Sequence, residues 1–555
     1  LNSLKGKFHL TSDFISISDL HVLLPNTTIS PNKIFLPING LNNISDVINN
    51  EVIRFELYKN KLTLSDFKSF VPAFSYNQEP LTVSLSVEGN KRNIILNHLS
   101  VNSNHEDLSL YIKGNFFNPD SIKKSKIILE KIEFNAKSNS VKNIINSISH
   151  IPQNFKEIIY RCGDISLQSF AHGSIENVNF NGTLNSSAGS IDLDLSYLNT
   201  KQNNNISGSI SINEFALNEL LNNQKFGVLT SEVNIDLSIR HKKIDGSIIL
   251  NAPLFTFNNY GYKNINIELF KEDNIISSDI NIDDKNLNIG IDGTIDISKD
   301  KKRANLNIDF SDINLNALNL INKYEDFILN GKIISEFEGN NIDDLTGFVA
   351  LNNLNFSNSS SNIHIDEFLL KVEEELVLLK SDIISGSLIG QYKLKRLPMV
   401  VKDILSSALP SIINHNNKTI NLNVESANST CQIEQLNMFD FNFTIKNDNR
   451  LTSFFNLPIR LIDDIDIVGH FDEVNGSADL MVNIPRFQQG KDKVIHDSYL
   501  NIEMDSQRDI FDLNLSTRLP GKNGDIFITL DGAIANGIID TNISWAFDRM
   551  KFYKG

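Results

Sequence analysis

The feature that most constrains this chain is an alternation of apolar and polar residues with a period of two, repeated along most of its length. The clearest case is the segment Glu232–Arg240, EVNIDLSIR. Successive side chains of a β-strand point to opposite faces, so this segment has one apolar face and one polar face. The apolar face holds Val233, Ile235, Leu237 and Ile239. Such alternation predicts antiparallel sheet with one face in water, because buried parallel strands are apolar throughout.

Other segments repeat this pattern. One presents Leu287, Ile289, Ile291, Ile295 and Ile297, with Gly293 in one apolar place, and the next presents Leu306, Ile308 and Phe310. Short Asn, Asp, Gly and Lys clusters separate the segments and are typical of hairpin turns, as in 201–205 (KQNNN) and 298–303 (SKDKKR). An Ile-x-Gly-x-Ile core recurs without a fixed period. The sequence therefore predicts an all-β fold, an elongated and curled antiparallel meander.

Length and charge limit the architecture and the partners. A single hydrophobic core stops growing at roughly 250–300 residues, whereas this chain has 555. It must therefore form several domains or one body that grows along an axis. Since no composition shift marks a boundary, we interpret residues 1–555 as one continuous segment. The net charge of -16 repels phosphate polyanions and argues against nucleic-acid binding.

Two segments have helical spacing, 139–160 and 398–410, and 215–221 is a weaker candidate. Helices inside a long sheet would most naturally plug or cap its apolar face. No run of about 18 apolar residues is present to span a membrane. The chain starts without Met, so we expect an internal piece of a longer protein, with any anchor upstream. The sequence leaves open whether Cys162 and Cys431 are paired.

Catalytic, metal and cofactor motifs are absent from the sequence. The 11 histidines are scattered and form no metal-binding spacing. Acidic pairs such as Asp192/Asp194 lie two apart on one strand face, where a solvated surface explains them better than acid–base catalysis or calcium binding. The Ile-x-Gly-x-Ile glycines lack the Lys-Ser/Thr of a phosphate loop. We therefore expect a protein that is not an enzyme and needs no cofactor.

The central question is what covers the apolar face. Burying one Ile or Leu is worth roughly 1.5–3 kcal/mol, so four on each strand cannot all remain in water. A second sheet packed about 10 Å away would cover them, as in a sandwich. A sheet curled into a trough would instead cover part of them and leave room for an apolar ligand such as an acyl chain. Alternation alone does not decide between these arrangements.

A resemblance to a known family favours the trough. The segments that carry it occur in a characteristic order from Leu184 to Leu394: LNSSAGSIDLDLSY, ISGSISINEFALNELL, FGVLTSEVNIDLSI, APLFTFNNYGYKNINIEL, DDLTGFVALNNLNF and SDIISGSLIGQYKL. In this order and spacing the region from about Leu167 to Leu409 resembles the TamB branch of the AsmA-like envelope proteins, in the form found in Bacteroidetes-like bacteria. The flanks, 1–166 and 410–555, have the same alternating β pattern, but their resemblance to the family is less specific.

The resemblance implies a periplasmic lipid conduit. In that family a curled β-sheet with an apolar groove carries phospholipids between the inner and outer membranes. The full-length protein would be anchored in the inner membrane by a segment outside this sequence, and an outer-membrane barrel of the Omp85 type would be its partner. The groove-lining residues we expect are Val233, Ile235, Leu237, Ile239, Leu287, Ile289, Ile291, Ile295, Ile297, Leu306, Ile308 and Phe310.

Two other functions remain open at this stage. The first is a β-sheet interaction module that helps outer-membrane proteins assemble, pairing its open edge with a nascent strand. The second is a surface adhesin or a structural β-solenoid. The sequence has no strict repeat for a solenoid and no calcium loops for an adhesin.

Overall fold

The structure is a computed structural model of the chain. It describes residues 2–554 apart from 39–50, 68–79, 104, 106, 120–123, 148–150, 175, 201–202, 242, 322–326, 359–361, 394, 396–436, 455–456, 491–492, 506–509, 522–523, 536–537 and 548–552. Strands make up 72% and helices 6%. The strands form one long antiparallel meander sheet that is not a closed barrel, as the alternation predicted. The chain divides into two compact units, Leu1–Asp273 with Ser278–Asp284, and Asn274–Ser277 with Lys285–Gly555.

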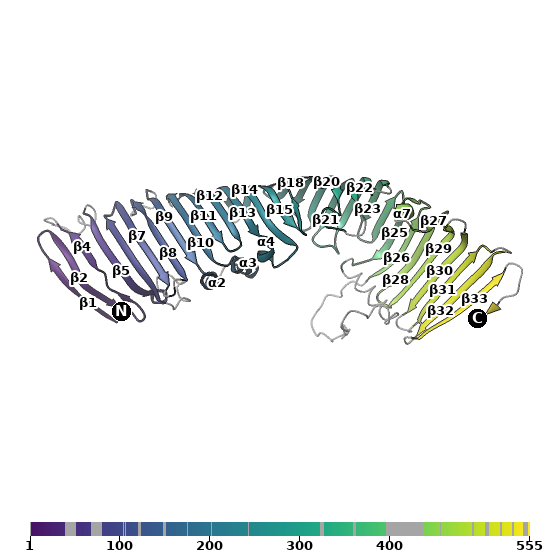
Figure 1. The fold of residues 1–555 in the computed structure, drawn as a ribbon, viewed down its shortest axis with the longest axis horizontal. Coiled ribbons are helices and arrows are strands. Elements are labelled where there is room, and N and C mark those ends of the chain that lie inside the picture. Colours follow the sequence, from purple (N-terminus) through teal and green to yellow (C-terminus); the bar gives the residue numbers. More distant parts are fainter. Residues whose placement is uncertain are drawn as a thin grey trace. The chain divides into compact units, whose positions relative to one another are not determined.

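In the first unit the strands lie side by side in chain order (Figure 1, purple to teal). Most pair antiparallel with the next strand; β4 pairs with β2, and β17 pairs with β15. The strands are β1 (Ser3–Leu10), β2 (Phe14–Leu23), β3 (Thr28–Ile29), β4 (Lys33–Pro37), β5 (Ile53–Thr63), β6 (Pro80–Gly89), β7 (Asn93–Ser103), β8 (Leu108–Phe117), β9 (Lys126–Ala136), β10 (Ile165–Gly173), β11 (Asn177–Ser186), β12 (Gly189–Asn199), β13 (Asn204–Ala216), β14 (Phe226–Arg240), β15 (Lys243–Phe257), β16 (Tyr260–Tyr262) and β17 (Ile265–Glu272). The following strand, β18 (Ile275–Asp284), contributes residues to both units.

The second unit continues the meander. Again neighbours pair antiparallel, except that β26 pairs with β28 and β27 with β29. Its strands are β19 (Leu287–Asp296), β20 (Lys302–Asn314), β21 (Ile328–Gly339), β22 (Thr346–Ser357), β23 (Asn362–Val372), β24 (Leu376–Ser381), β25 (Ile384–Gln391), β26 (Met438–Ile445), β27 (Ile459–Leu461), β28 (Ile465–Asp472), β29 (Ser477–Gln489), β30 (Lys493–Asp505), β31 (Ile510–Leu519), β32 (Ile526–Ala535), β33 (Ile538–Phe547) and β34 (Tyr553–Lys554).

The helices are few and short. The segment 139–160 contains α2 (Ser138–Ser147) and α3 (Gln153–Arg161), which are separated at Pro152 because proline is accepted at a helix start but not inside a helix. The weaker candidate contains α4 (Leu217–Leu221). Among the described residues, the other helical elements are η1 (Leu64–Phe67) and α7 (Arg450–Phe454). The expected helix at 398–410 lies outside the described residues.

In the first unit the described helices follow one long edge of the sheet. Antiparallel pairing brings the C-terminal ends of β5, β9 and β13 to the same edge, since an even number of pairings separates them. The elements that follow these ends are η1, α2 with α3, and α4, and Figure 1 shows the three α-helices along one side of the strands. We call this the helix edge. The opposite hairpin edge carries the turns that join β6–β7, β8–β9, β10–β11, β12–β13 and β14–β15.

Bulges keep the apolar side chains on one face. In β13 the alternation runs to Ile212, an extra residue is inserted, and the apolar face resumes at Phe215. The inserted position is Glu214, whose φ of 47° lies in the left-handed region. Residues with positive φ also occur at register shifts in β5, β20, β22 and β30, namely Lys59, Asp312, Asn353 and Asp497. Without such insertions every later side chain of the strand would face the other way.

Buried residues are concentrated near the strand ends. At the helix edge of the first unit, Phe215, Ala188 and Leu220 form a cluster with Ile158 of α3. A second cluster joins Leu57, Leu81 and Val83 at the same edge. The largest cluster in the second unit combines Phe310, Phe327, Leu354, Ile363, Ile365 and Ile383.

Candidate functional site: an open apolar groove

One apolar row crosses the first unit from β1 to β17. Starting from β1, each member is the direct antiparallel partner of the next. The members are Phe8, Ile17, Ile34, Phe55, Val87, Leu96, Gly114, Leu129, Ala171, Phe180, Leu195, Gly208, Ile235, Ile248 and Leu269. Neighbouring strands lie roughly 4.8 Å apart, so the row extends about 67 Å along the sheet. No charged or polar side chain interrupts this first apolar row.

A second apolar row crosses the second unit in the same way, from β19 to β33. Its members are Gly293, Leu306, Ser335, Val349, Leu370, Leu379, Gly386, Phe443, Ile467, Val482, Leu500, Leu515, Leu530 and Ile543. This row extends about 62 Å at the same strand spacing. Its one polar member, Ser335, is buried, with 5% of its surface exposed.

Most members of both rows keep part of their surface accessible. In the first row only Leu96, Gly114 and Ala171 are buried, and in the second only Gly293 and Ser335. At the outer strands exposure is high, with Phe8 at 63% and Ile543 at 43%. A second sheet or a layer of helices would bury these positions as in a protein core. The described part of each unit therefore has a groove-like apolar face that no other layer covers.

The residues expected from the sequence to line a groove share this face but differ in environment. Val233, Ile235, Leu237 and Ile239 of β14 are all half-buried, and Ile235 belongs to the first apolar row. In the second unit Leu306 belongs to the second row. The others have three environments. Phe310 is buried and Ile289 and Ile308 pack against its cluster. Leu287 and Ile291 are half-buried, whereas Ile295 and Ile297 are 39% and 37% exposed.

Pairs of glycine and phenylalanine on the apolar face went unrecognised in the sequence. A Cβ added at Gly331 would lie 2.8 Å from Cζ of Phe310, and the neighbouring strands pair these two residues directly. Gly386 stands in the same relation to Phe443. Each glycine thus leaves room for an aromatic ring above the sheet. Such a ring covers the strand where the glycine has no side chain to pack. The sequence signal was a glycine at an apolar place of the alternation.

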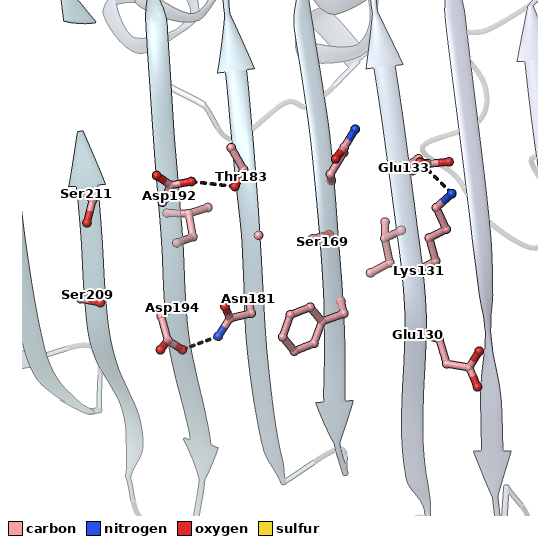
Figure 2. Close-up of a pocket in the computed structure, with 15 residues that line it drawn as sticks. Glu130, Lys131, Glu133, Ser169, Asn181, Thr183, Asp192, Asp194, Ser209 and Ser211 are labelled. Atoms are coloured by element: carbon pink, nitrogen blue, oxygen red, sulfur yellow. Dashed lines mark hydrogen bonds and ion pairs between the residues drawn. The ribbon is translucent and has the colours of Figure 1, made fainter. Parts of the chain in front are cut away.

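The opposite face is polar and held by cross-strand hydrogen bonds. Figure 2 shows a shallow depression there, over β9 to β13. Thr183 Oγ1 donates to Asp192 Oδ1 over 2.6 Å, and Asn181 Nδ2 donates to Asp194 Oδ1 over 2.7 Å (Figure 2). Both carboxylates thus accept hydrogen bonds from the neighbouring strand, as is common on the solvated face of a sheet.

Among the described residues no group of three or more His, Cys, Asp or Glu side chains could hold a metal ion. Cys162 is a free thiol that packs against the cluster of Ala188, Phe215 and Leu220, and burial raises its pKa. Cys431 lies outside the described residues. Within the described part of the chain no helix is long and apolar enough to cross a membrane.

Comparisons with known proteins give no relative. No family model matches the sequence, and neither a curated protein nor a solved structure matches it.

Proposed function

We propose that this chain is a segment of a bridge-like lipid transfer conduit, which carries phospholipid acyl chains along its apolar groove without catalysing a reaction. The observation that carries the proposal is the first apolar row, continuous over about 67 Å and open to solvent along most of its course. A path for an acyl chain has to be apolar at every step and accessible from the side. The row meets both requirements.

The energetics of such a face suit transfer better than storage. Burying one CH₂ group is worth about 0.8 kcal/mol, and an acyl chain on an open face is covered on one side only. Each position therefore contributes part of that value, and neighbouring positions contribute similar amounts. A lipid on such a surface binds weakly at every point and moves along it without a deep minimum.

The surroundings of this conduit follow from the resemblance to TamB. We propose that it acts in the periplasm, receives phospholipid from the inner membrane, where the full-length protein is anchored, and delivers it to the outer membrane. An Omp85-type barrel is the partner proposed at the outer membrane.

A pair of variants in β14 tests the conduit. Ile235→Asp introduces a charge into the first apolar row, whereas Asn234→Asp introduces the same charge one residue away on the polar face. Ile235 is half-buried beside Gly208, so the new carboxylate reaches water and both variants fold. We expect Ile235→Asp to reduce the transfer of a fluorescent phospholipid between donor and acceptor vesicles at least tenfold, and Asn234→Asp to leave it unchanged.

Circular dichroism and thermal unfolding provide the folding control. Normal transfer by folded Ile235→Asp protein would contradict the proposal, because lipid has to pass every point of a conduit in series. An equal loss in both variants would also contradict it, since the apolar face would then have no special role.

A further inference from the structure

The depression on the polar face, over β9 to β13 (Figure 2), includes an aromatic residue, Phe170 of β10. Its neighbour Ala171 belongs to the first apolar row, so Phe170 points to the opposite, polar face. There the Phe170 side chain is 48% exposed. Ser169 meanwhile lies on the apolar face, so at this point β10 reverses the alternation that the rest of the strand follows.

A β-bulge lies directly beside this ring. The register of β9 against β10 shifts here, so that two residues of β9, Glu130 and Lys131, are opposite the single residue Phe170. A bulge bends its strand and re-aims side chains, and bulges are frequent next to active sites. Glu130 forms an ion pair with Lys113 over 2.8 Å, and Lys131 forms one with Glu133 over 2.9 Å. The charged groups at this end of the depression thus neutralise one another in pairs.

Two cross-strand rows of side chains line the rest of the depression, from β10 to β13. Within each row every member is the direct antiparallel partner of the next. One row is Phe170, Asn181, Asp194 and Ser209, and the other is Gln168, Thr183, Asp192 and Ser211. The rows lie about 6.8 Å apart along the strands, and each extends about 14 Å across them. Their amide and hydroxyl groups both donate and accept hydrogen bonds, which suits a ligand rich in hydroxyl groups.

Charge narrows the class of ligand further. The lining carries four carboxylates against one ammonium group, that of Lys131, so it repels phosphates and acidic polymers. A cationic ligand would be attracted, but it only donates hydrogen bonds and would leave the amide and hydroxyl donors of the two rows unused. Among the described residues no group of carboxylates could hold a metal ion. An uncharged ligand with many hydroxyl groups therefore fits the depression best.

We propose that this depression binds a short run of a neutral, extended, β-linked glycan chain, with one sugar ring stacked on Phe170. The negative π face of the phenyl ring attracts the C–H groups on the face of a sugar. Asp192 and Asp194, which Thr183 and Asn181 hold in place by hydrogen bonds, accept further hydrogen bonds from sugar hydroxyls. An extended chain lies flat on the open face of a sheet, and the space measures about 570 Å³. The site is independent of lipid transfer, which uses the opposite face.

Isothermal titration calorimetry of the full chain with cellohexaose tests the site. We expect saturable binding that added salt leaves unchanged, because the ligand carries no charge. Phe170→Ala should weaken binding about tenfold, whereas Phe170→Tyr should retain it. The matched control is Leu198→Ala, which removes a 41% exposed apolar side chain from the same face outside the depression and should leave the affinity unchanged. Circular dichroism confirms that each variant is folded.

Absence of cellohexaose binding, or an equal affinity in folded Phe170→Ala protein, would overturn the proposal. Tighter binding of an oligogalacturonate of the same length would also overturn it, since the lining would then prefer a negatively charged ligand. A lysine-rich peptide that displaces cellohexaose at low salt but not at high salt would identify a site for cationic polypeptides instead. Phospholipid transfer between vesicles should be unchanged in Phe170→Ala, and its loss together with glycan binding would contradict a separate site on the polar face.

Discussion

Truncation of two apolar side chains in the second unit separates an open groove from a closed core. Phe310 is 8% exposed, lies in the cluster with Phe327 and Leu354, and its ring covers Gly331. In Phe310→Ala the ring's volume stays empty, because the strand backbones on either side are fixed by their ladder. The expected loss is about 3–5 kcal/mol.

Ile295 lies on the same face of the neighbouring strand β19 but is 39% exposed. Much of its side chain already contacts water, so Ile295→Ala leaves no closed cavity and removes only part of the transfer free energy of the deleted carbons. We expect a loss of about 1 kcal/mol or less. The predicted loss of stability is thus several times larger for Phe310→Ala than for Ile295→Ala, although both substitutions remove apolar atoms from the same face of adjacent strands.

Hydrogen exchange of the β19–β21 amides, measured in increasing urea, reports the local stability of this region. It is preferable to a single global unfolding curve because a 555-residue chain of two units does not have to unfold in one step. Comparable losses of about 3 kcal/mol or more in both variants would refute the open groove, since Ile295 would then have to be covered. Small losses in both would refute the packed cluster.

Three further outcomes are expected. Gly469→Ala should destabilise β28 by about 1–3 kcal/mol, as measured by urea unfolding, because the new methyl group overlaps the backbone carbonyl oxygen of Asp479 and the ring of Phe441. Arg450 donates a hydrogen bond to Asp448 and so lowers the pKa of that carboxyl. Because this pKa is lowered in the folded state, the ionised Asp448 stabilises the fold at pH values above the ordinary Asp pKa. Hydrogen-exchange protection of the α7 amides should therefore decrease when the pH is lowered beneath about 4. It should also be weaker in Arg450→Ala than in the unsubstituted protein at neutral pH. Glu214→Gly should raise the free energy of unfolding by about 0.5–1 kcal/mol and the melting temperature slightly, since the left-handed φ of 47° strains any residue with a Cβ.

The apolar face was predictable from the sequence because it depends on neighbouring residues only. In β14 the alternation identifies Val233 and Ile235 as one face and Glu232 and Asp236 as the other, and the structure has the first pair half-buried and the second exposed. The breaks in alternation were also visible, as in Ile212 followed by Phe215, but they were not interpreted as bulges. A left-handed residue depends on its partner strand, and a single sequence does not specify that partner.

Coverage of the apolar face was not predictable. Ile295 and Ile289 occupy equivalent places in the alternation of one strand, yet Ile289 contacts the buried cluster while Ile295 is open. The difference arises at the strand ends, where side chains from β22 and β23, together with Ile383 between β24 and β25, gather over β19 and β20. Such contacts join residues far apart in the chain, and the alternation contains no information about them.

Continuity of the groove nevertheless follows from local rules. In an antiparallel pair, directly opposed residues lie on the same face, so each hairpin passes the apolar face from one strand to the next. A slip of one residue at any hairpin would move the apolar side chains of the following strands to the other face and interrupt the row that crosses this hairpin. The bulges at Glu214 and Asp312 have the same importance within their strands. Each inserts one residue, so that the following apolar side chains return to the apolar face. A continuous apolar row therefore needs no contacts between residues far apart in the chain. It needs only the correct register at each turn, and a single wrong register is enough to interrupt it.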